Sequence, residues 1–390
     1  VENNDYWIER TKLLEDKLSD RLHEELTKSF IDKRASVLAR GLKQDTIFDT
    51  KIIENKKVVI DNQFIGELKG LKLELDLKTG TLDTDVKSLK KAARQTIGPE
   101  FQNRIIQIID KEEIELKEDF KIYWKEFPIA KLLPGKDYLK PEFNLIVDEM
   151  IETSEKKKLY FFLESWIDKK INTILKSLID LKNSKEKKSN TRALAYQLYE
   201  NNGVVKREYV TDYLERLDQE DRKNLRSIGV KFGRYHIYLY KLLKPEAVSL
   251  RLVLWKNYHQ KYFDFKPPKF GLNFLESDKL LNKNFMLISG FEKFDKYYVR
   301  IDILERLFIE IINSNENKSD KIKLLPKMLN LLGCDKESFV KVIKLMGYKV
   351  FDEKNETFFK YKPFKKIKKS LDLKIKKDNP FEALKQLDLK

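Results

Sequence analysis

The stretch GVKFGRYHIYLYKLLKPEAVSLRLVLW, from Gly229 to Trp255, carries the strongest fold signal in the sequence. Its first half alternates apolar and polar residues, which is typical of a β-strand, and a Lys-Pro junction then leads into a helix. Pro245 suits the first helical position because its missing N–H would have no partner there, and Glu246 complements the positive end of the helix dipole. Apolar residues occupy most sides of this helix, so we expect it to lie deep in a core, with Arg251 as its exceptional charged member.

Basic and aromatic side chains are interleaved in the strand that precedes this helix. Such a mixture suits phosphates and unstacked bases. The sequence therefore predicts a nucleic-acid-binding strand whose contacts come from Lys231, Arg234, Tyr235 and Tyr238. The alternative is an ordinary half-buried strand with solvated lysines, because aromatic residues favour strands in any protein.

Four segments, in a fixed order along the chain, resemble the marked stretches of one protein family. They are RLHEELTKSFIDKR from Arg21, GELKGLKLELD from Gly66, the stretch from Gly229 quoted above, and NPFEALKQL from Asn379. Together they are similar to the C-terminal region of a family of alpha-proteobacterial superfamily-two ATP-dependent helicases, which is related to the mitochondrial degradosome RNA helicase. The resemblance implies two motor domains, using ATP and Mg²⁺, that lie in the same polypeptide but are absent from this chain. It also implies an accessory region that guides single-stranded RNA or DNA leaving the motor.

Composition limits the classes of function. The net charge is +16, from 79 basic and 63 acidic residues, which suggests a polyanionic partner such as nucleic acid. The codon usage of an AT-rich genome is an alternative source for part of the lysine surplus. The single cysteine, Cys334, excludes an internal disulfide framework and fits a reducing compartment. No run is apolar enough to span a membrane, so the sequence predicts a cytoplasmic location without membrane contact.

The sequence predicts a mostly α-helical fold, with a multi-helix domain that contains one small antiparallel β meander. Short alternating runs between Lys56 and Leu75 indicate the meander, and a Pro-Pro pair at Pro267 indicates a domain boundary. A winged helix-turn-helix-like domain and a basic tail follow. The predicted parts are a helical N-terminal segment (1–50), a small β meander (51–80), a helical domain (81–182), a linker (183–190), a helical core with a strand (191–266), a winged-helix-like domain (267–362) and a basic tail with a short docking helix (363–390).

Local signals predict the elements of the helical domain. Gly98 is expected to end one helix and Pro99 to start the next. The segment 128–141 contains three prolines and a glycine and is expected to be a loop between helical blocks. A long helix is predicted from about Ser154 to Leu181, because apolar residues recur there at helical spacing.

The C-terminal domain shows helix, tight turn, helix and hairpin in that order. Gly333 is expected to stop the first helix and Asp335 to cap the second. This order is typical of a winged helix-turn-helix, so nucleic-acid contacts are predicted on the second helix. The predicted residues are Lys336, Lys341 and Lys344. Small helical domains that bind proteins share the same order, which leaves the nature of the ligand open.

The last residues of the basic tail form a second candidate site. Asn379 is a good N-cap, Pro380 suits the first helical position, and an apolar face would follow. We expect a short helix that docks on the parent helicase or on a partner protein such as a nuclease. Its docking residues would be Phe381, Leu384 and Leu387. The alternative is an ordinary frayed terminus.

The sequence lacks the usual marks of catalysis. It contains neither a phosphate-binding GxxxxGK[ST] loop nor a dinucleotide fingerprint, and its three histidines and single cysteine lack the spacing of a zinc site or a nucleophile with its base. We therefore predict no catalytic residue, metal or cofactor for this chain and no ATP hydrolysis by the chain alone. The predicted function is a nucleic-acid-binding accessory region of a helicase. The alternative is a protein-interaction scaffold with no direct role in nucleic-acid binding.

Overall fold

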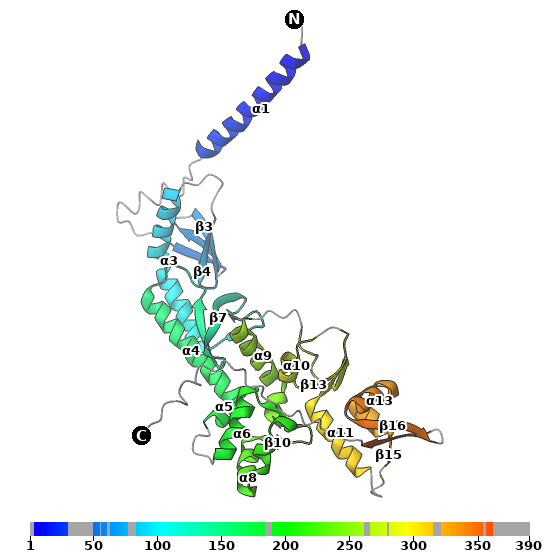
Figure 1. Ribbon diagram of the computed structural model, residues 1–390. Helices are drawn as coiled ribbons and strands as arrows, with labels where there is room; N and C mark the ends of the chain where they lie inside the picture. The colour runs from blue at the N-terminus through cyan, green and yellow to red at the C-terminus, as the bar shows by residue number, and fades with distance from the viewer. Residues whose placement is uncertain are drawn as a thin grey trace, which may run out of the picture. The chain divides into compact units, whose positions relative to one another are not determined.

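The computed structural model mixes helices and strands along the described residues (Figure 1). It describes residues 4–29, 50–54, 56–60, 63–76, 83–183, 189–260, 266–278, 281–314, 321–353 and 356–361. The chain divides into two compact units, with the boundary between Pro267 and Pro268. The described strands form five small antiparallel sheets, so the fold is mixed α/β, and the predicted mostly α-helical fold with one small meander is wrong. No described helix is long and apolar enough to cross a membrane.

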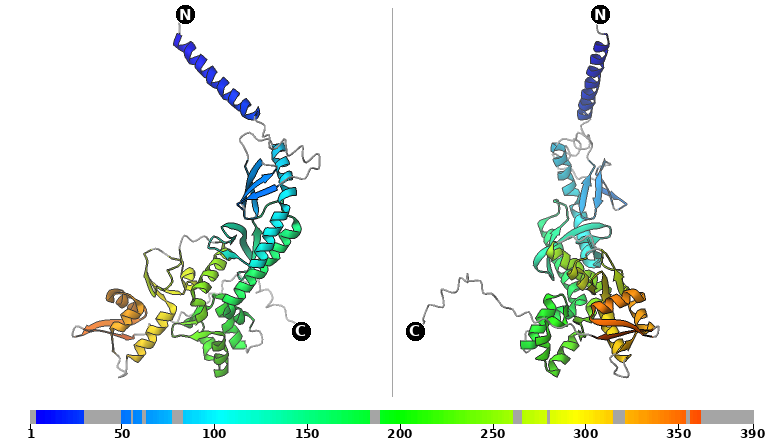
Figure 2. Two further views of the ribbon diagram at one scale, coloured as in Figure 1. Left: turned by 180° about the vertical axis from the view of Figure 1, so that it is seen from behind. Right: turned by 45° about the vertical axis from the view of Figure 1, so that its right-hand side comes forward.

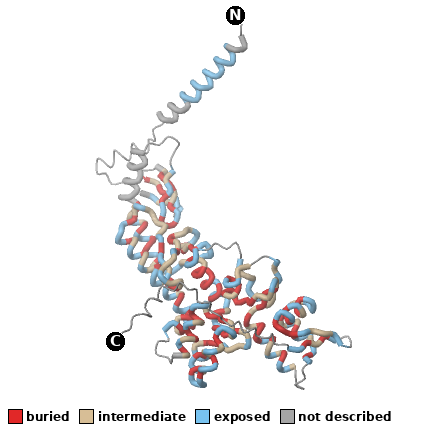
Figure 3. The backbone as a smooth tube through the Cα atoms, viewed as in Figure 1, coloured by how far each residue is buried: buried red, intermediate tan, exposed pale blue. Residues whose placement is uncertain are grey.

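Helix α1 spans Asn4–Ser29, where the sequence predicts a helix. Its described side chains, from residue 7 to residue 22, are exposed, as the pale blue tube in Figure 3 shows. Apolar side chains on this helix, among them Trp7, Leu14, Leu18 and Leu22, are therefore open to solvent.

The first unit contains two copies of one arrangement, a four-stranded meander followed by a helix. In both sheets the strands lie side by side in chain order. The pairing of the second strand with the third shifts register in both sheets, after Val58 in the first and after Ile122 in the second. Figures 1 and 2 show the two following helices in contact. The first copy is β1 (Thr50–Ile53), β2 (Lys57–Ile60), β3 (Gln63–Lys69), β4 (Lys72–Leu75) and α3 (Asp83–Lys111), and the second is β5 (Ile114–Leu116), β6 (Lys121–Trp124), β7 (Phe127–Asp137), β8 (Lys140–Leu145) and α4 (Thr153–Ile174).

The second meander corrects the predicted loop at 128–141. This segment forms most of β7 and the start of β8. Prolines break a strand only where a ladder hydrogen bond is required. Pro134 and Gly135 lie in the irregular stretch between Leu133 and Asp137, where the pairing of β7 with β8 shifts register. The turn residues therefore mark a bulge in a strand and not a loop.

The predicted break at Gly98 and Pro99 is also wrong, because α3 continues through both residues. A proline in a helix clashes with the Cβ of the residue before it, and Gly98 has none. The helix also gains from burial after the proline, since Phe101, Ile105 and Ile108 are almost fully buried. Packing therefore compensates for the hydrogen bond that Pro99 cannot make.

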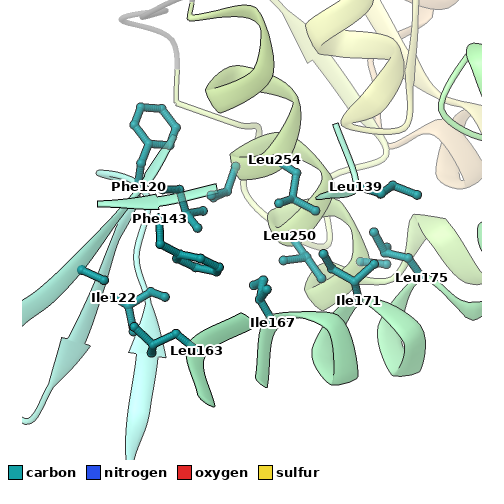
Figure 4. Packing of buried hydrophobic residues seen from close by; sticks show 14 of the residues in the cluster. Phe120, Ile122, Leu139, Phe143, Leu163, Ile167, Ile171, Leu175, Leu250 and Leu254 are labelled. Atoms are coloured by element: carbon teal, nitrogen blue, oxygen red, sulfur yellow. The ribbon is translucent and has the colours of Figure 1, made fainter. Parts of the chain in front are cut away.

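Helix α9 (Pro245–His259) lies at the centre of the first unit's core, as expected from its sequence. It packs against β7 and α4, and Figure 4 shows Leu250 and Leu254 facing Phe143 of β8 and Ile171 of α4. The long helix predicted from about Ser154 to Leu181 is present but breaks at Leu175, after which α5 (Lys176–Lys182) continues. Leu175 itself is fully buried, so the break keeps the apolar side turned inward.

Arg251 is fully buried in α9 because its guanidinium satisfies main-chain carbonyls. Nη1 donates to the carbonyl of Asn202 and Nη2 to that of Leu242, each at 2.6 Å. Burial lowers the pKa of Arg251 to about 10. Arg251 therefore links α9 to the main chain at Asn202 and at Leu242, which explains why a charged residue lies in this buried helix.

A three-stranded sheet follows the linker region in the first unit. Its strands lie in the order β10-β11-β9, so the stretch predicted as one strand is a hairpin of two strands paired to a third. The elements are α6 (Ser189–Glu200), β9 (Val204–Lys206), η1 (Arg207–Tyr209), α7 (Thr211–Glu215), α8 (Gln219–Ile228), β10 (Val230–Phe232), β11 (His236–Leu239) and η2 (Tyr240–Leu243).

The second unit contains two further three-stranded sheets, ordered β12-β14-β13 and β15-β17-β16. The helix, turn, helix and hairpin predicted from the sequence are present between Pro326 and Tyr361, whereas the sheet before them was not predicted. The elements are β12 (Phe274–Glu276), α10 (Lys283–Ile288), β13 (Phe291–Phe294), β14 (Tyr297–Arg300), α11 (Ile301–Asn313), β15 (Ile322–Lys323), α12 (Pro326–Leu332), α13 (Lys336–Leu345), β16 (Tyr348–Glu353) and β17 (Glu356–Tyr361).

Candidate nucleic-acid interface

Helix α13 presents the lysines predicted in the second unit on its exposed side. The Asp335 carboxylate caps the helix by accepting a hydrogen bond from the Ser338 N–H at 3.1 Å. Phe339, Val342 and Ile343 are buried, which fixes the side that faces outward. The three predicted lysines are exposed and form no ion pair with any described residue: Lys336, Lys341 and Lys344.

The hairpin β10–β11 holds the residues predicted from the opening stretch, but it does not present all of them. Lys231 and Arg234 are exposed and Tyr235 is half-buried, whereas Tyr238 is only 7% exposed. A ring buried to that extent offers little surface on which a base could stack. The exposed aromatic beside Lys231 is instead Tyr240, whose ring centroid lies 5.4 Å from the Lys231 Nζ.

A basic face on α8 was not predicted. Asp218 caps this helix by accepting from the Asp221 N–H at 2.7 Å, and Gly229 ends it at φ 110°, a left-handed conformation suited to glycine. Three basic residues follow one side of the helix and line, with Gln219 and Glu220, a hollow of about 760 Å³. They are Arg222, Lys223 and Arg226.

Contacts hold two of these arginines in place. The guanidinium carbons of Arg222 and Arg226 lie 6.0 and 5.6 Å from the ring centroid of Phe232, and Arg222 Nη2 donates to the Leu214 carbonyl at 2.8 Å. Lys223 is exposed and forms no ion pair with any residue in the described ranges. The i, i+4 spacing of the arginines after the Asp218 cap was the signal that could have located this face.

A second groove of the first unit has the wrong charge for phosphates, because acidic side chains predominate among its charged residues. It has a volume of about 810 Å³ and lies between the β5–β6 segment, α4 and α9. Its charged lining is mostly acidic, and the Tyr123 hydroxyl donates to Asp119 at 2.7 Å, a bond that raises the pKa of Tyr123. The charged lining residues are Glu115, Glu118, Asp119 and Glu246, with Lys117 and Lys170.

Burial and hydrogen bonds explain the shifted pKa values of three further groups in the two units. Burial raises the pKa of Asp137, but hydrogen bonds from Lys182, the Leu139 N–H and Tyr199 outweigh it, so the pKa of the carboxyl is lowered overall. Burial and the bond to Asp137 raise the pKa of Tyr199 to about 12. Burial likewise raises the pKa of Cys334 to about 12, which disfavours the thiolate form.

Among the described residues no group of three or more His, Cys, Asp or Glu side chains is placed to hold a metal ion. The predicted docking residues Phe381, Leu384 and Leu387 lie outside the described residues. Comparisons with family models, with curated proteins and with solved structures gave no match for this chain.

Proposed function

We propose that this chain is a nucleic-acid-binding accessory region of an ATP-dependent helicase, which guides single-stranded RNA or DNA leaving the motor. One observation carries the binding part of the proposal: α13 exposes three lysines that no described carboxylate neutralises. The helix belongs to a helix-turn-helix followed by a hairpin, an arrangement that places its second helix against nucleic acid. The net charge of +16 supports the same partner.

The helicase part of the proposal rests on the family resemblance. In it, ATP and Mg²⁺ belong to motor domains of the same polypeptide, and a nuclease is a candidate partner of the tail. The cytoplasm is the proposed location, supported by the single cysteine.

Salt dependence measures the number of phosphate contacts. For single strands, the logarithm of the affinity falls against the logarithm of the salt concentration with a slope of about −0.7 for each phosphate neutralised. If each of the three lysines on α13 neutralises one phosphate, together they contribute roughly −2 to the slope. This contribution should disappear when the three side chains lose their charge.

The test compares two triple variants of the full chain by fluorescence anisotropy with a labelled oligo-uridine at several KCl concentrations. The first carries Lys336→Gln, Lys341→Gln and Lys344→Gln, and should bind more weakly with a shallower slope. The matched control removes the same net charge from lysines of the second unit that already pair with carboxylates, and should bind like the parent. Those lysines are Lys296, Lys323 and Lys327. Equal losses in the two variants, or no binding by the parent chain, would refute the proposed site.

The exposed apolar stripe of α1 favours a second candidate function, protein interaction. Trp7, Leu14, Leu18 and Leu22 are each more than half exposed. An apolar contact of this kind responds little to salt, in contrast to a phosphate contact. Partner binding that survives high KCl and is lost on Leu14→Asp and Leu18→Asp would support the scaffold function.

A further inference from the structure

The three small sheets that begin at β9, β12 and β15 share one plan. In each, the first strand precedes a helix, a hairpin follows that helix, and the first strand pairs with the second strand of the hairpin. All pairings are antiparallel. We call these units copy 1 (204–239), copy 2 (274–300) and copy 3 (322–361).

The helix in each copy also begins and ends in the same way. Its N-cap is Asp218, Asn282 or Asp335, and each of these side chains accepts a hydrogen bond from the N–H three residues later. A glycine with positive φ then leads into the hairpin at Gly229, Gly290 or Gly347. Two of the copies are longer: copies 1 and 3 carry an extra helix between the first strand and the capped helix and are preceded by α6 and α11.

Counting from this glycine aligns the buried side of the helices. The residue four positions before it is buried in every copy, as Leu225, Met286 and Ile343. In copies 1 and 3 the residue eight positions before it is buried as well, as Asp221 and Phe339. Since residues four apart share a helix face, the positions three and six residues before the glycine must face outward in both long copies.

Those outward positions, and the second residue after the glycine, are basic in copies 1 and 3 only. All six of these side chains are exposed. In copy 2 the same positions hold Asn284, Leu287 and the buried Glu292. The equivalent residues are Lys223, Arg226 and Lys231 in copy 1, and Lys341, Lys344 and Lys349 in copy 3.

We propose that copies 1 and 3 carry two equivalent phosphate-binding faces, which bind one nucleic-acid strand together, whereas copy 2 makes no phosphate contact. This inference rests on the proposed function and extends it, because the α8 face becomes a second binding site. The ligand is the sugar–phosphate backbone of a single strand long enough to reach both faces.

Two faces on one chain make binding depend on ligand length. Once the first face holds the strand, binding of the second is intramolecular, and linked sites gain a factor of about 10² or more over one site alone. A strand of about 8 nucleotides covers one site of ordinary size, whereas one of about 40 nucleotides can occupy two. Loss of either face should remove this length advantage and leave the affinity for the short strand largely intact.

The experiment measures the affinity of the full chain for labelled oligo-uridines of these two lengths, with a duplex of the longer length as a further arm. Three variants are compared, each with three basic residues changed to Gln, and circular dichroism confirms their folding. The face 1 variant changes Lys223, Arg226 and Lys231, the face 2 variant changes Lys341, Lys344 and Lys349, and the copy 2 control changes Lys283, Lys293 and Lys296.

We expect the parent and the copy 2 control to bind the long strand at least about 100-fold more tightly than the short one. For both face variants, the affinities for the long and the short strand should differ by less than about 3-fold, after correction for the larger number of binding positions on the long strand. If the face 1 variant keeps the full length advantage while the face 2 variant loses affinity for both lengths, the two-face inference fails and the proposed function stands. A length advantage seen with the duplex alone also overturns it, and a parent chain that binds neither strand refutes both proposals.

Discussion

Replacing Leu254 with alanine tests whether α9 is the centre of the first unit's core. Leu254 is fully buried, and α4 and β7 pack against its helix. The change removes three carbons, which cost about 2.4 kcal/mol in transfer free energy at about 0.8 kcal/mol each. A cavity that neighbours on two sides cannot close adds to this, so we expect a loss of about 3 to 4 kcal/mol in the free energy of unfolding.

Urea unfolding followed by tryptophan fluorescence is the appropriate assay. All four tryptophans, Trp7, Trp124, Trp166 and Trp255, belong to the first unit, so the signal reports that unit alone. With a slope of about 2 kcal/mol per molar urea, the midpoint should fall by roughly 1.5 to 2 M.

The control makes the same chemical change at Leu133 of β7, which is 38% exposed. A partly solvated leucine loses less transfer energy and leaves no closed cavity, so Leu133→Ala should cost about 1 kcal/mol or less. Equal midpoints for the two variants would refute the assignment of α9 to the core.

Three further predictions concern single contacts. Asp137→Asn should destabilise the first unit at neutral pH. The folded-state pKa of this carboxyl is lowered below its ordinary 3.8, so the ionised group adds stability at higher pH, and the difference from the parent should disappear as the pH falls through the lowered pKa. Urea midpoints measured from neutral to acid pH test this. Asp335→Ala should cost the second unit about 1 kcal/mol by removing the cap of α13, whereas Asp335→Asn should cost much less, as followed by thermal unfolding in far-ultraviolet circular dichroism. Gly203→Ala should destabilise the first unit by more than about 1 kcal/mol, because φ is 84° and the new Cβ would overlap Leu242; a urea midpoint equal to the parent's would contradict this.

The sequence predicted helices with clear caps better than it predicted sheets. Pro245 at the start of α9 and Asp335 before α13 act locally, so neighbouring residues were enough to locate them. The sheet β5–β8 was missed because Pro134 sits in a bulge, and whether a proline interrupts a strand depends on pairing that only the folded chain defines. The same limit applies to Pro99, which burial further along α3 makes tolerable.

The candidate site was predicted in part for a similar reason. The lysines of α13 follow from the helical period, which places them opposite Phe339 and Ile343. Tyr238 was predicted to bind because basic and aromatic side chains interleave in that stretch. All four residues of β11 are nevertheless buried, since β11 is the central strand of its sheet. The equivalence of α8 and α13 becomes visible only when the two helices are aligned on the glycines that follow them.

The nearly local pairing of the sheets has a consequence for how the chain folds. Among the described residues, the paired strands that lie farthest apart in the sequence are β15 and β17, with Ile322 opposite Phe359. Each sheet can therefore form soon after its last strand is synthesised. Helix α9 is different, because it completes a core whose other walls, β7 and α4, were synthesised long before it. During synthesis the parts of Phe143 and Ile171 that face α9 stay open to solvent until α9 emerges from the ribosome. In that interval the nascent chain carries an apolar surface that favours aggregation and that a chaperone could cover.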